Sequence, residues 1–315
     1  MRIKKIDFLK AFFSAVVAFA VLAVILALLL INKPKIEVAD SIYANSLNIK
    51  FEEENQNPIV VKTEDLTEAA AEAESPVENT ISAAATPDSF FHEMGINLHE
   101  SGYPSDNSSQ NSINYCKKLA YEGLSNFPTY HVKGLNDLTL TLKSEGKRGM
   151  AGNGRMILRC ENLDDSEFVA VLTHEMGHIV DGSYLTGNSG EKSEFIDLGK
   201  SVFSSDKSVE YYELSWKNNS NWKTGVTEND FCSSYGGTDP YEDFAECYIY
   251  YILHGEEFEK SSGSNLVLKQ KYEFMKNNVF AGMTYDYDKG QNLASTSLPS
   301  DVVRLSYDYD LFINQ

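Results

Sequence analysis

The sequence is poor in basic residues. Its 315 residues include 27 lysines and arginines against 46 aspartates and glutamates, which gives a formal net charge of −19. Nucleic acids and anionic lipid headgroups bind positively charged surfaces, so this charge balance argues against either as a ligand of the folded part. We therefore expect no nucleic-acid partner, and we attribute the acidic surface to solubility.

Cysteine and histidine are scarce as well. None of the four cysteines lies in a C-x-x-C pair, so a cysteine-rich zinc site is not expected. Four cysteines allow three disulfide pairings, and the sequence does not choose among them for Cys116, Cys160, Cys232 and Cys247. Four of the six histidines have no spacing typical of a metal site and are expected in surface or core roles: His92, His99, His131 and His254.

One long hydrophobic run lies near the N-terminus. Residues 11–31 contain no charge, and Ser14 is their only polar residue. A run of about 20 such residues spans a bilayer as a helix, which predicts a transmembrane anchor at 11–31. Basic residues predominate in residues 1–10, so the positive-inside rule predicts a cytoplasmic tail there and an extracellular remainder.

A cleaved signal peptide is the alternative for this segment, because a basic start before an apolar run describes both. The run is longer than the roughly 7–15 residues of a signal core, and no small-x-small cleavage site directly follows it. We favour a single-pass cell-membrane protein; cleavage would make the protein secreted. In both cases the cysteines are exported, and disulfides are permitted there.

The composition changes again over residues 32–88, where acids recur, alanines cluster and aromatics nearly vanish. Such a segment buries too little apolar surface to offset its ordering entropy, which predicts a disordered acidic stalk. Aromatics return at Phe90 and Phe91, and we place one folded domain at 89–315. No internal repeat is visible.

Within that domain the pattern predicts an α+β fold, with a few strands early and helices late. A helix is expected over 165–180, capped by Asp165 or Ser166 and ended by Gly182. Strands are expected over 137–143 and 155–159. Further helices are expected over 111–123, 191–203, 207–217, 240–254 and 264–278.

The helix over 165–180 carries the motif H-E-x-x-H. Positions i and i+4 share one helix face, so His174 and His178 can point two imidazoles at a single zinc ion. Glu175 lies one step around the helix, where its carboxylate would act as the general base that deprotonates a water at that ion. The alternative is an ordinary amphipathic helix whose polar face is solvated.

A third ligand distinguishes these interpretations. The metzincin extension is missing, because its glycine and third histidine fall on Asp181 and Tyr184. Asp181 is itself a possible ligand one turn beyond His178, although we prefer it as a partner of a ligand or as a helix-end residue. The remaining candidate is Glu242 on the predicted helix over 240–254.

Glu242 and Glu246 share one stripe of that helix, which is apolar almost all round. Two carboxylates heading into an apolar interior need a cation or strong donors, so we expect zinc at Glu242 and the N–H of a ligand histidine at Glu246. The structural alternative is a capping box between Asp239 and Glu242, which would leave Glu246 unexplained.

The motifs HEMGH (174–178) and SYGGTDPYEDFAE (234–246) resemble those of the lethal-factor-like zinc peptidases, gluzincin-type enzymes that include the Pro-Pro endopeptidases. The resemblance covers about residues 110–280. It implies His174, His178 and Glu242 as zinc ligands, Glu175 as general base and Tyr235 as a hydroxyl donor to the oxyanion. Tyr241 lies close to Tyr235 and weakens that last assignment.

The resemblance also implies a zincin-like fold, with a small twisted sheet over the H-E-x-x-H helix and a helical C-terminal half carrying the glutamate. The strand at 155–159 would then be the edge strand along which an extended peptide lies. His178 and Glu242 are 64 positions apart, which is long for a compact zincin. The intervening residues 182–225 must therefore add helices or a flap near the site.

The leading hypothesis is a membrane-anchored extracellular zinc endopeptidase that acts on a peptide or protein substrate. The first alternative is a catalytically inactive zincin-fold surface domain that binds peptide or protein partners. The second is a surface domain without a metal.

Overall fold

The computed structural model describes residues 86–102, 107–143, 146–288 and 298–314, which all belong to one compact unit, Glu72–Gln315. The predicted cytoplasmic tail, anchor and almost all of the predicted stalk lie outside these residues. In the part that is described, no helix has the length and apolar character needed to cross a membrane. Among the described residues, the first helix is α3 (Pro87–Met94), which starts just before the predicted domain boundary.

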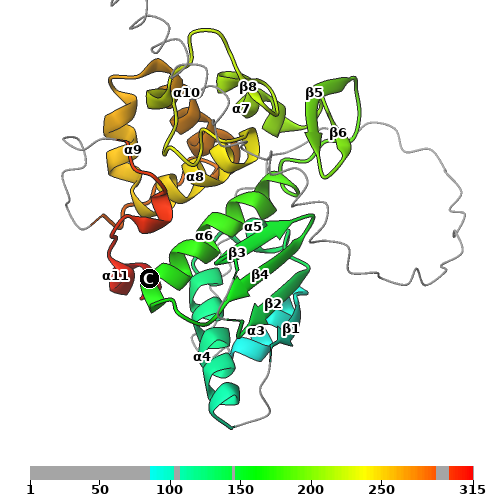
Figure 1. Ribbon diagram of the computed structural model, residues 1–315, viewed down its shortest axis with the longest axis vertical. Coiled ribbons are helices and arrows are strands. Elements are labelled where there is room, and N and C mark those ends of the chain that lie inside the picture. The colour runs from blue at the N-terminus through cyan, green and yellow to red at the C-terminus, as the bar shows by residue number, and fades with distance from the viewer. Residues whose placement is uncertain (1–85, 103–106, 144–145, 289–297, 315) are drawn as a thin grey trace, which may run out of the picture. The chain divides into compact units, whose positions relative to one another are not determined.

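The N-terminal half contains a four-stranded sheet with the order β1-β2-β4-β3 (Figure 1). Strands β1, β2 and β4 are parallel, and β3 pairs antiparallel with β4. The bounds are β1 (Asn97–Ser101), β2 (Asp137–Thr141), β3 (Gly149–Gly152) and β4 (Arg155–Arg159). Both predicted strands are confirmed, but β4 lies inside the sheet. The expectation that residues 155–159 form the edge strand is wrong, because β3 covers that edge.

Two helices accompany the sheet, α4 (Asn107–Leu124) and α6 (Asp165–Asp181). The short α5 (Thr129–Val132) packs on α6. A disulfide between Cys116 and Cys160 joins α4 to the residue that follows β4. Helix α6 contacts β3 and β4 on one side and α8 on the other, so it lies between the sheet and the helical half of the domain (Figure 1).

The C-terminal half is mostly helical. Its helices are α7 (Lys207–Ser215), α8 (Pro240–Leu253), α9 (Gly255–Ser262), α10 (Leu266–Phe274), the π-helix η2 (Met275–Val279) and α11 (Tyr309–Ile313). Short 3-10 turns, η1 (Glu228–Asp230) and η4 (Val302–Arg304), and a small hairpin, β7 (Trp216–Asn218) with β8 (Asn221–Trp222), complete it. The mixed α+β architecture predicted from the sequence is confirmed, whereas α9 was not predicted.

The predicted helix over 191–203 is wrong. These residues form a hairpin of β5 (Lys192–Asp197) and β6 (Lys200–Phe203), joined by a two-residue turn. Leu198 and Gly199 in that turn both have positive φ, 45° and 77°. The usual sequence signal for such a turn is Asn-Gly, and a leucine in its first position conceals it. The hairpin lies between His178 and Glu242, in the interval where the sequence predicts added helices or a flap.

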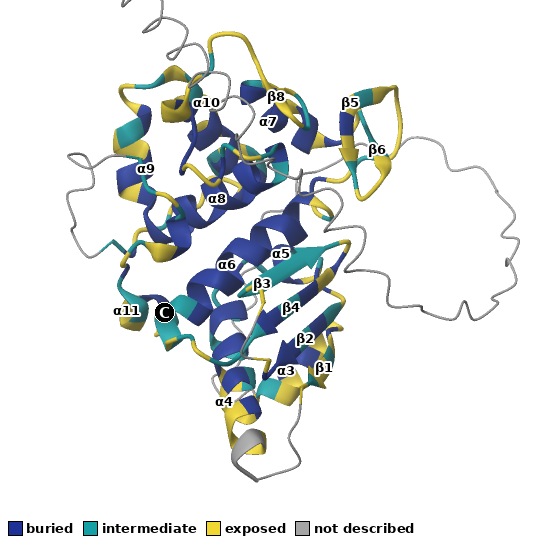
Figure 2. Cartoon of the chain, viewed as in Figure 1, coloured by how far each residue is buried: buried dark blue, intermediate teal, exposed yellow. Residues whose placement is uncertain are grey.

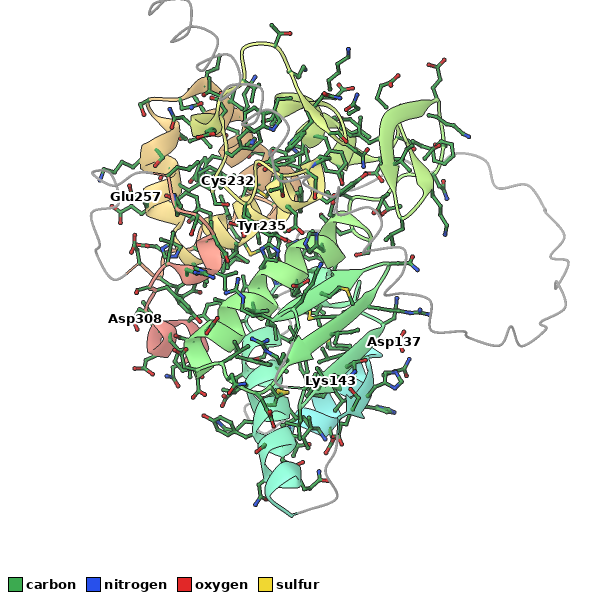
Figure 3. All side chains as sticks on the ribbon, in the orientation of Figure 1. Asp137, Lys143, Cys232, Tyr235, Glu257 and Asp308 are labelled. Atoms are coloured by element: carbon green, nitrogen blue, oxygen red, sulfur yellow. A yellow bond between two sulfur atoms is a disulfide. The ribbon has the colours of Figure 1, made fainter. Side chains whose placement is uncertain are left out.

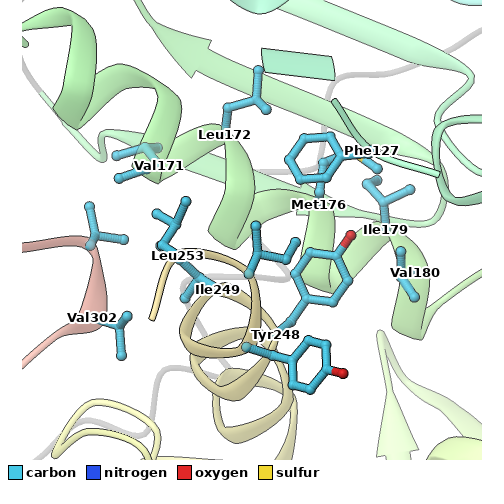
Figure 4. Close-up of a cluster of buried hydrophobic side chains, with 14 of the residues drawn as sticks. Phe127, Val171, Leu172, Met176, Ile179, Val180, Tyr248, Ile249, Leu253 and Val302 are labelled. Carbon is cyan, nitrogen blue, oxygen red and sulfur yellow. The ribbon is translucent and has the colours of Figure 1, made fainter. Parts of the chain in front are cut away.

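Helices α6 and α8 form the centre of the core. Both are buried almost all round (Figure 2), and their apolar side chains interdigitate with those of neighbouring segments (Figure 4). The two helices cross closely at Gly177, because a Cβ atom there would lie 2.8 Å from the Cα of Ala245. A glycine between the two motif histidines therefore sets how near α8 can come.

A buried ion pair joins α8 to α10 on the side of α8 that faces away from α6. Lys271 Nζ donates to both carboxylate oxygens of Asp243 at 2.8 Å and to the Asp230 carbonyl at 2.8 Å. Trp216 Nε1 and the Tyr211 hydroxyl also donate to Asp243, at 2.9 and 3.3 Å. The network links α7, α8 and α10, and both charged side chains are fully buried.

Gly177→Ala should lower the free energy of unfolding by about 1–3 kcal/mol, because its methyl group meets backbone rather than a movable side chain. Denaturant unfolding measures this change. Gly123→Ala in α4 is the control, since its methyl would contact a Leu172 side-chain carbon at 3.2 Å and both substitutions gain the same helix propensity. Equal stability of the two variants would contradict a tight crossing.

Lys271→Met should cost about 3–5 kcal/mol of unfolding free energy, because it leaves the Asp243 carboxylate buried without its counter-charge. Lys269→Met removes an exposed lysine from the same helix and should change stability little. Chemical denaturation of both variants with the disulfides intact makes the comparison. If Lys271→Met unfolds at the same denaturant concentration as Lys269→Met, the ion pair does not stabilise α8.

Candidate metal centre

Helix α6 presents the histidine pair. Its N-cap is Asp164, whose side chain accepts a hydrogen bond from the Glu167 N–H, rather than Asp165 or Ser166 as predicted. The predicted end at Gly182 is confirmed, and the Gly182 N–H donates to the His178 carbonyl. The predicted helix is thus in place, with His178 in its last turn and His174 one turn earlier.

Helix α8 presents the glutamates. Asp239 caps it by accepting hydrogen bonds from the N–H groups of Tyr241 and Glu242, and Pro240 occupies the first turn. Because Asp239 satisfies these donors, the Glu242 side chain is free to extend toward α6. Its carboxylate contacts Tyr235 and the histidines, so it does not serve as the second half of a capping box.

The three predicted ligands meet. Glu242 Oε2 lies 3.2 Å from His174 Nε2 and 3.3 Å from His178 Nε2. One ligand atom from each residue falls within 4.8 Å of the other two, so this group could bind a metal ion. The exposed fractions are 7% for His174, 9% for His178 and 5% for Glu242, which places the group below the surface.

Glu246 contacts the other ring nitrogen of His174. Its Oε1 lies 2.8 Å from His174 Nδ1, and its Oε2 accepts a hydrogen bond from the Val302 N–H at 2.8 Å. A proton on His174 Nδ1 leaves the Nε2 lone pair directed at the Glu242 side of the site. This is the arrangement expected for Glu246 from the sequence, and the contribution of Val302 was not foreseen.

The protein groups at this site attract positive charge. Burial lowers the pKa of His174, but the hydrogen bonds and charges of Glu242 and Glu246 outweigh burial and raise this pKa well above its ordinary value. Burial raises the pKa of Glu242, but the two histidines outweigh it and hold this pKa well below the usual range. Two carboxylates facing two imidazoles thus favour cationic charge between them, whether protons or a metal ion.

Glu175 has an unused oxygen. Its side chain is 6% exposed, and Oε2 has no hydrogen-bond partner among the described residues. Burial raises the pKa of this carboxyl group. Strand β3 passes directly over it, because a Cβ atom on Gly149 would lie 2.5 Å from Glu175 Oε1. A buried carboxyl oxygen without a partner is costly, which fits a group whose partner arrives with a ligand.

Tyr235 lies at the outer side of the site and is 40% exposed (Figure 3). Its hydroxyl donates to Glu242 Oε1 at 2.8 Å, and its ring centroid lies 6.1 Å from that of His174. Tyr241, the competing tyrosine, instead accepts a hydrogen bond from Asn219 and packs on Tyr212. Of the two tyrosines, Tyr235 is therefore the one that touches a predicted ligand.

Asp181 has a different partner. The Tyr212 hydroxyl of α7 donates to its Oδ2, and burial raises the pKa of Asp181 to about 7. It is not one of the three residues of the metal-binding group. Its contact with α7 is consistent with the predicted helix-end position.

The Cys232–Cys247 disulfide lies next to the site. Cys247 follows Glu246 on α8, and Cys232 precedes the loop that carries Tyr235. The structure thereby selects one of the three pairings that the sequence left open, and the bridge ties the Tyr235 loop to the helix of the glutamates.

Comparison with known proteins adds no further identification. No protein-family model matches the chain, and no similar curated protein is found. The resemblance to lethal-factor-like peptidases therefore rests on the two sequence motifs and stays a prediction.

Glu246→Gln should weaken metal binding by about 10–100-fold, the usual cost of removing the partner of a ligand histidine. Titration of the metal-stripped protein with Zn²⁺ measures this loss. Glu256→Gln, an exposed change on α9, is the control and should bind as the unaltered protein does. Unchanged affinity in Glu246→Gln would remove Glu246 from the metal centre.

Proposed function

We propose that this protein is a zinc endopeptidase with a zincin-like fold, held at the outer face of the cell membrane by residues 11–31. The observation that carries the proposal is the meeting of His174, His178 and Glu242 beside the unpartnered Glu175 oxygen. A sheet, an H-E-x-x-H helix packed on it and a second helix carrying the glutamate support the zincin assignment.

The donor set suits zinc. Two imidazole nitrogens and one carboxylate oxygen are the protein ligands of many catalytic zinc sites, which leave one position for water or substrate. When bound there, zinc supplies Lewis acidity, which polarises a peptide carbonyl and makes an attacking water more acidic. The structural zinc sites of proteins usually have four protein ligands, so a three-residue set favours catalysis.

Glu175 is the proposed general base. Its carboxylate takes a proton from the attacking water as the new C–O bond forms, and it then delivers that proton to the leaving amine as the C–N bond breaks. Burial raises the pKa of this carboxyl group, which makes its carboxylate a stronger base for the first of these transfers. Its unpartnered Oε2 is the atom available to the water.

Tyr235 is the proposed oxyanion donor. In the structure its hydroxyl donates to Glu242, so this role requires the hydroxyl to turn from Glu242 to the substrate oxygen. The partial exposure of the side chain supports such a movement. One oxyanion donor contributes a factor of about 10²–10³ in rate.

Strand β3 is the proposed docking edge for the substrate. It forms one end of the four-stranded sheet and lies against Glu175 through Gly149. An extended peptide can add to such an edge as a further strand through main-chain hydrogen bonds. The strand consists of Gly149, Met150, Ala151 and Gly152, and its small residues let a second backbone approach closely.

Two observations favour the alternative of an inactive zincin-fold domain that binds peptide or protein partners. The site residues are nearly buried, and the Tyr235 hydroxyl is already engaged with Glu242. In that case the metal would hold α6 and α8 together without hydrolysing a bond. The two functions differ in whether any peptide is cleaved.

Glu175→Gln should abolish most hydrolysis while retaining the metal, with a loss of about 10²–10⁴ in kcat, because general-base catalysis contributes that factor. Digestion of a broad peptide library by the zinc-loaded protein, with zinc content measured alongside, tests this. Glu256→Gln again serves as the control.

The possible outcomes separate the functions. Cleavage by the unaltered protein that disappears in Glu175→Gln supports the peptidase, and equal activity of the two refutes the base assignment. Zinc binding without any cleavage would support the inactive domain, and absence of zinc would exclude both.

A further inference from the structure

A segment shortly before α11 runs along the candidate metal centre. We call residues 298–304 the C-terminal strap. The Ser234 N–H donates to the Pro299 carbonyl at 2.8 Å, and the Tyr235 N–H donates to the Ser300 carbonyl at 3.0 Å. Two consecutive backbone hydrogen bonds thus fix the segment that carries Tyr235, whose hydroxyl reaches Glu242.

The next contact reaches the other side of the site. The Val302 N–H donates to Glu246 Oε2 at 2.8 Å, while Glu246 Oε1 faces His174 Nδ1. The strap therefore contacts two segments that each hold a predicted ligand. One carries Tyr235, which hydrogen-bonds to Glu242, and the other carries Glu246, which faces His174.

The strap is itself firmly held. Asp301 pairs with Arg148, the residue before β3, and its Oδ1 accepts a hydrogen bond from the Val303 N–H at 2.9 Å. The Val302 side chain is fully buried and lies near Val171, Ile249 and Leu253 (Figure 4). Turn η4 contacts both α6 and α8, so the Val302 N–H is presented from a packed position.

We propose that the C-terminal strap is a positioning element of the metal centre and that the Val302 peptide N–H is its decisive group. Glu246 is completely buried, and only a fixed donor on Oε2 keeps Oε1 directed at His174. That contact keeps the His174 Nε2 lone pair directed at the site. The inference rests on the zinc site of the proposed function but does not depend on hydrolysis.

Val302→Pro tests the proposal by removing this N–H. Val302 is the first residue of η4, a position that tolerates proline. Asp301 has φ −162° and ψ 126°, the extended conformation that a residue before proline requires. Val302→Ala is the matched control, because it removes packing atoms but keeps the N–H.

Zinc affinity of the metal-stripped full-length protein is the first readout, with Zn²⁺ alone as the titrant. We expect Val302→Pro to weaken binding about tenfold, the lower end of the range for partners of a ligand. Val302→Ala should stay within about twofold, because its hydrogen bond remains. Equal affinity of the two variants would overturn the proposal.

A double-mutant cycle with Glu246→Gln is the second readout. If Val302 acts through Glu246, adding Val302→Pro to Glu246→Gln should change zinc affinity by less than about twofold, because coupled residues are not additive. A full additional tenfold loss would show that the N–H does not act through Glu246, and would also overturn the proposal.

An amide-to-ester replacement at the Asp301–Val302 bond covers the case in which the proline variant does not fold. It removes the same hydrogen without a ring, and it can be introduced by ligating a synthetic C-terminal peptide to the remainder of the chain. The ester should reproduce the tenfold loss, and unaltered affinity would refute the strap's role. Failure of the unaltered protein to bind zinc would instead refute the proposed function, on which this inference rests.

Discussion

The close crossing of α6 and α8 is the contact on which the rest of the structure depends. At Gly177 the two backbones come so near that a single methyl group would collide with Ala245. Each helix carries its candidate site residues within one turn of this point, His174 and His178 on α6 and Glu242 and Glu246 on α8. Because close-packed helices resist small displacements, the crossing holds the imidazoles of α6 at a fixed distance from the carboxylates of α8.

Charge at the site is balanced locally rather than by the protein as a whole. The chain is strongly acidic, yet the buried carboxylates of α8 each have a specific partner: Asp243 pairs with Lys271, Glu246 with His174 and Val302, and Glu242 with Tyr235 and the histidines. On α6, Glu175 Oε2 has no hydrogen-bond partner among the described residues. A buried carboxyl oxygen without a partner is costly, so a ligand that supplied a donor to it would be favoured there.

The residues of the candidate site could be predicted from the sequence because the patterns that indicate them are local. The four-residue spacing of His174 and His178 fixes a shared helix face, and the proline that opens α8 together with its Asp239 cap fixes the phase of Glu242 and Glu246. Periodicity also predicts most of the helices. Which distant segments of the chain meet in space, however, depends on tertiary packing, and the local patterns do not specify that packing.

The failures have the same origin. The order of strands in a sheet depends on non-local pairing, so nothing within residues 155–159 shows that β3 lies outside them. The sequence over 192–203 does not reveal its hairpin, because Leu198 occupies a turn position that glycine or asparagine usually marks. Val302 could not have been found at all, because its contribution is a backbone N–H that every residue except proline possesses.

The strap also has a consequence for the order of events during synthesis. Ribosomes make a chain from its N-terminus, so Tyr235, both histidines and all of α8 exist before residues 298–304 have been made. The hydrogen bonds that hold Glu246 and the Tyr235 loop can therefore form only after residues 298–304 have been made, and a product that stops before them would lack these bonds.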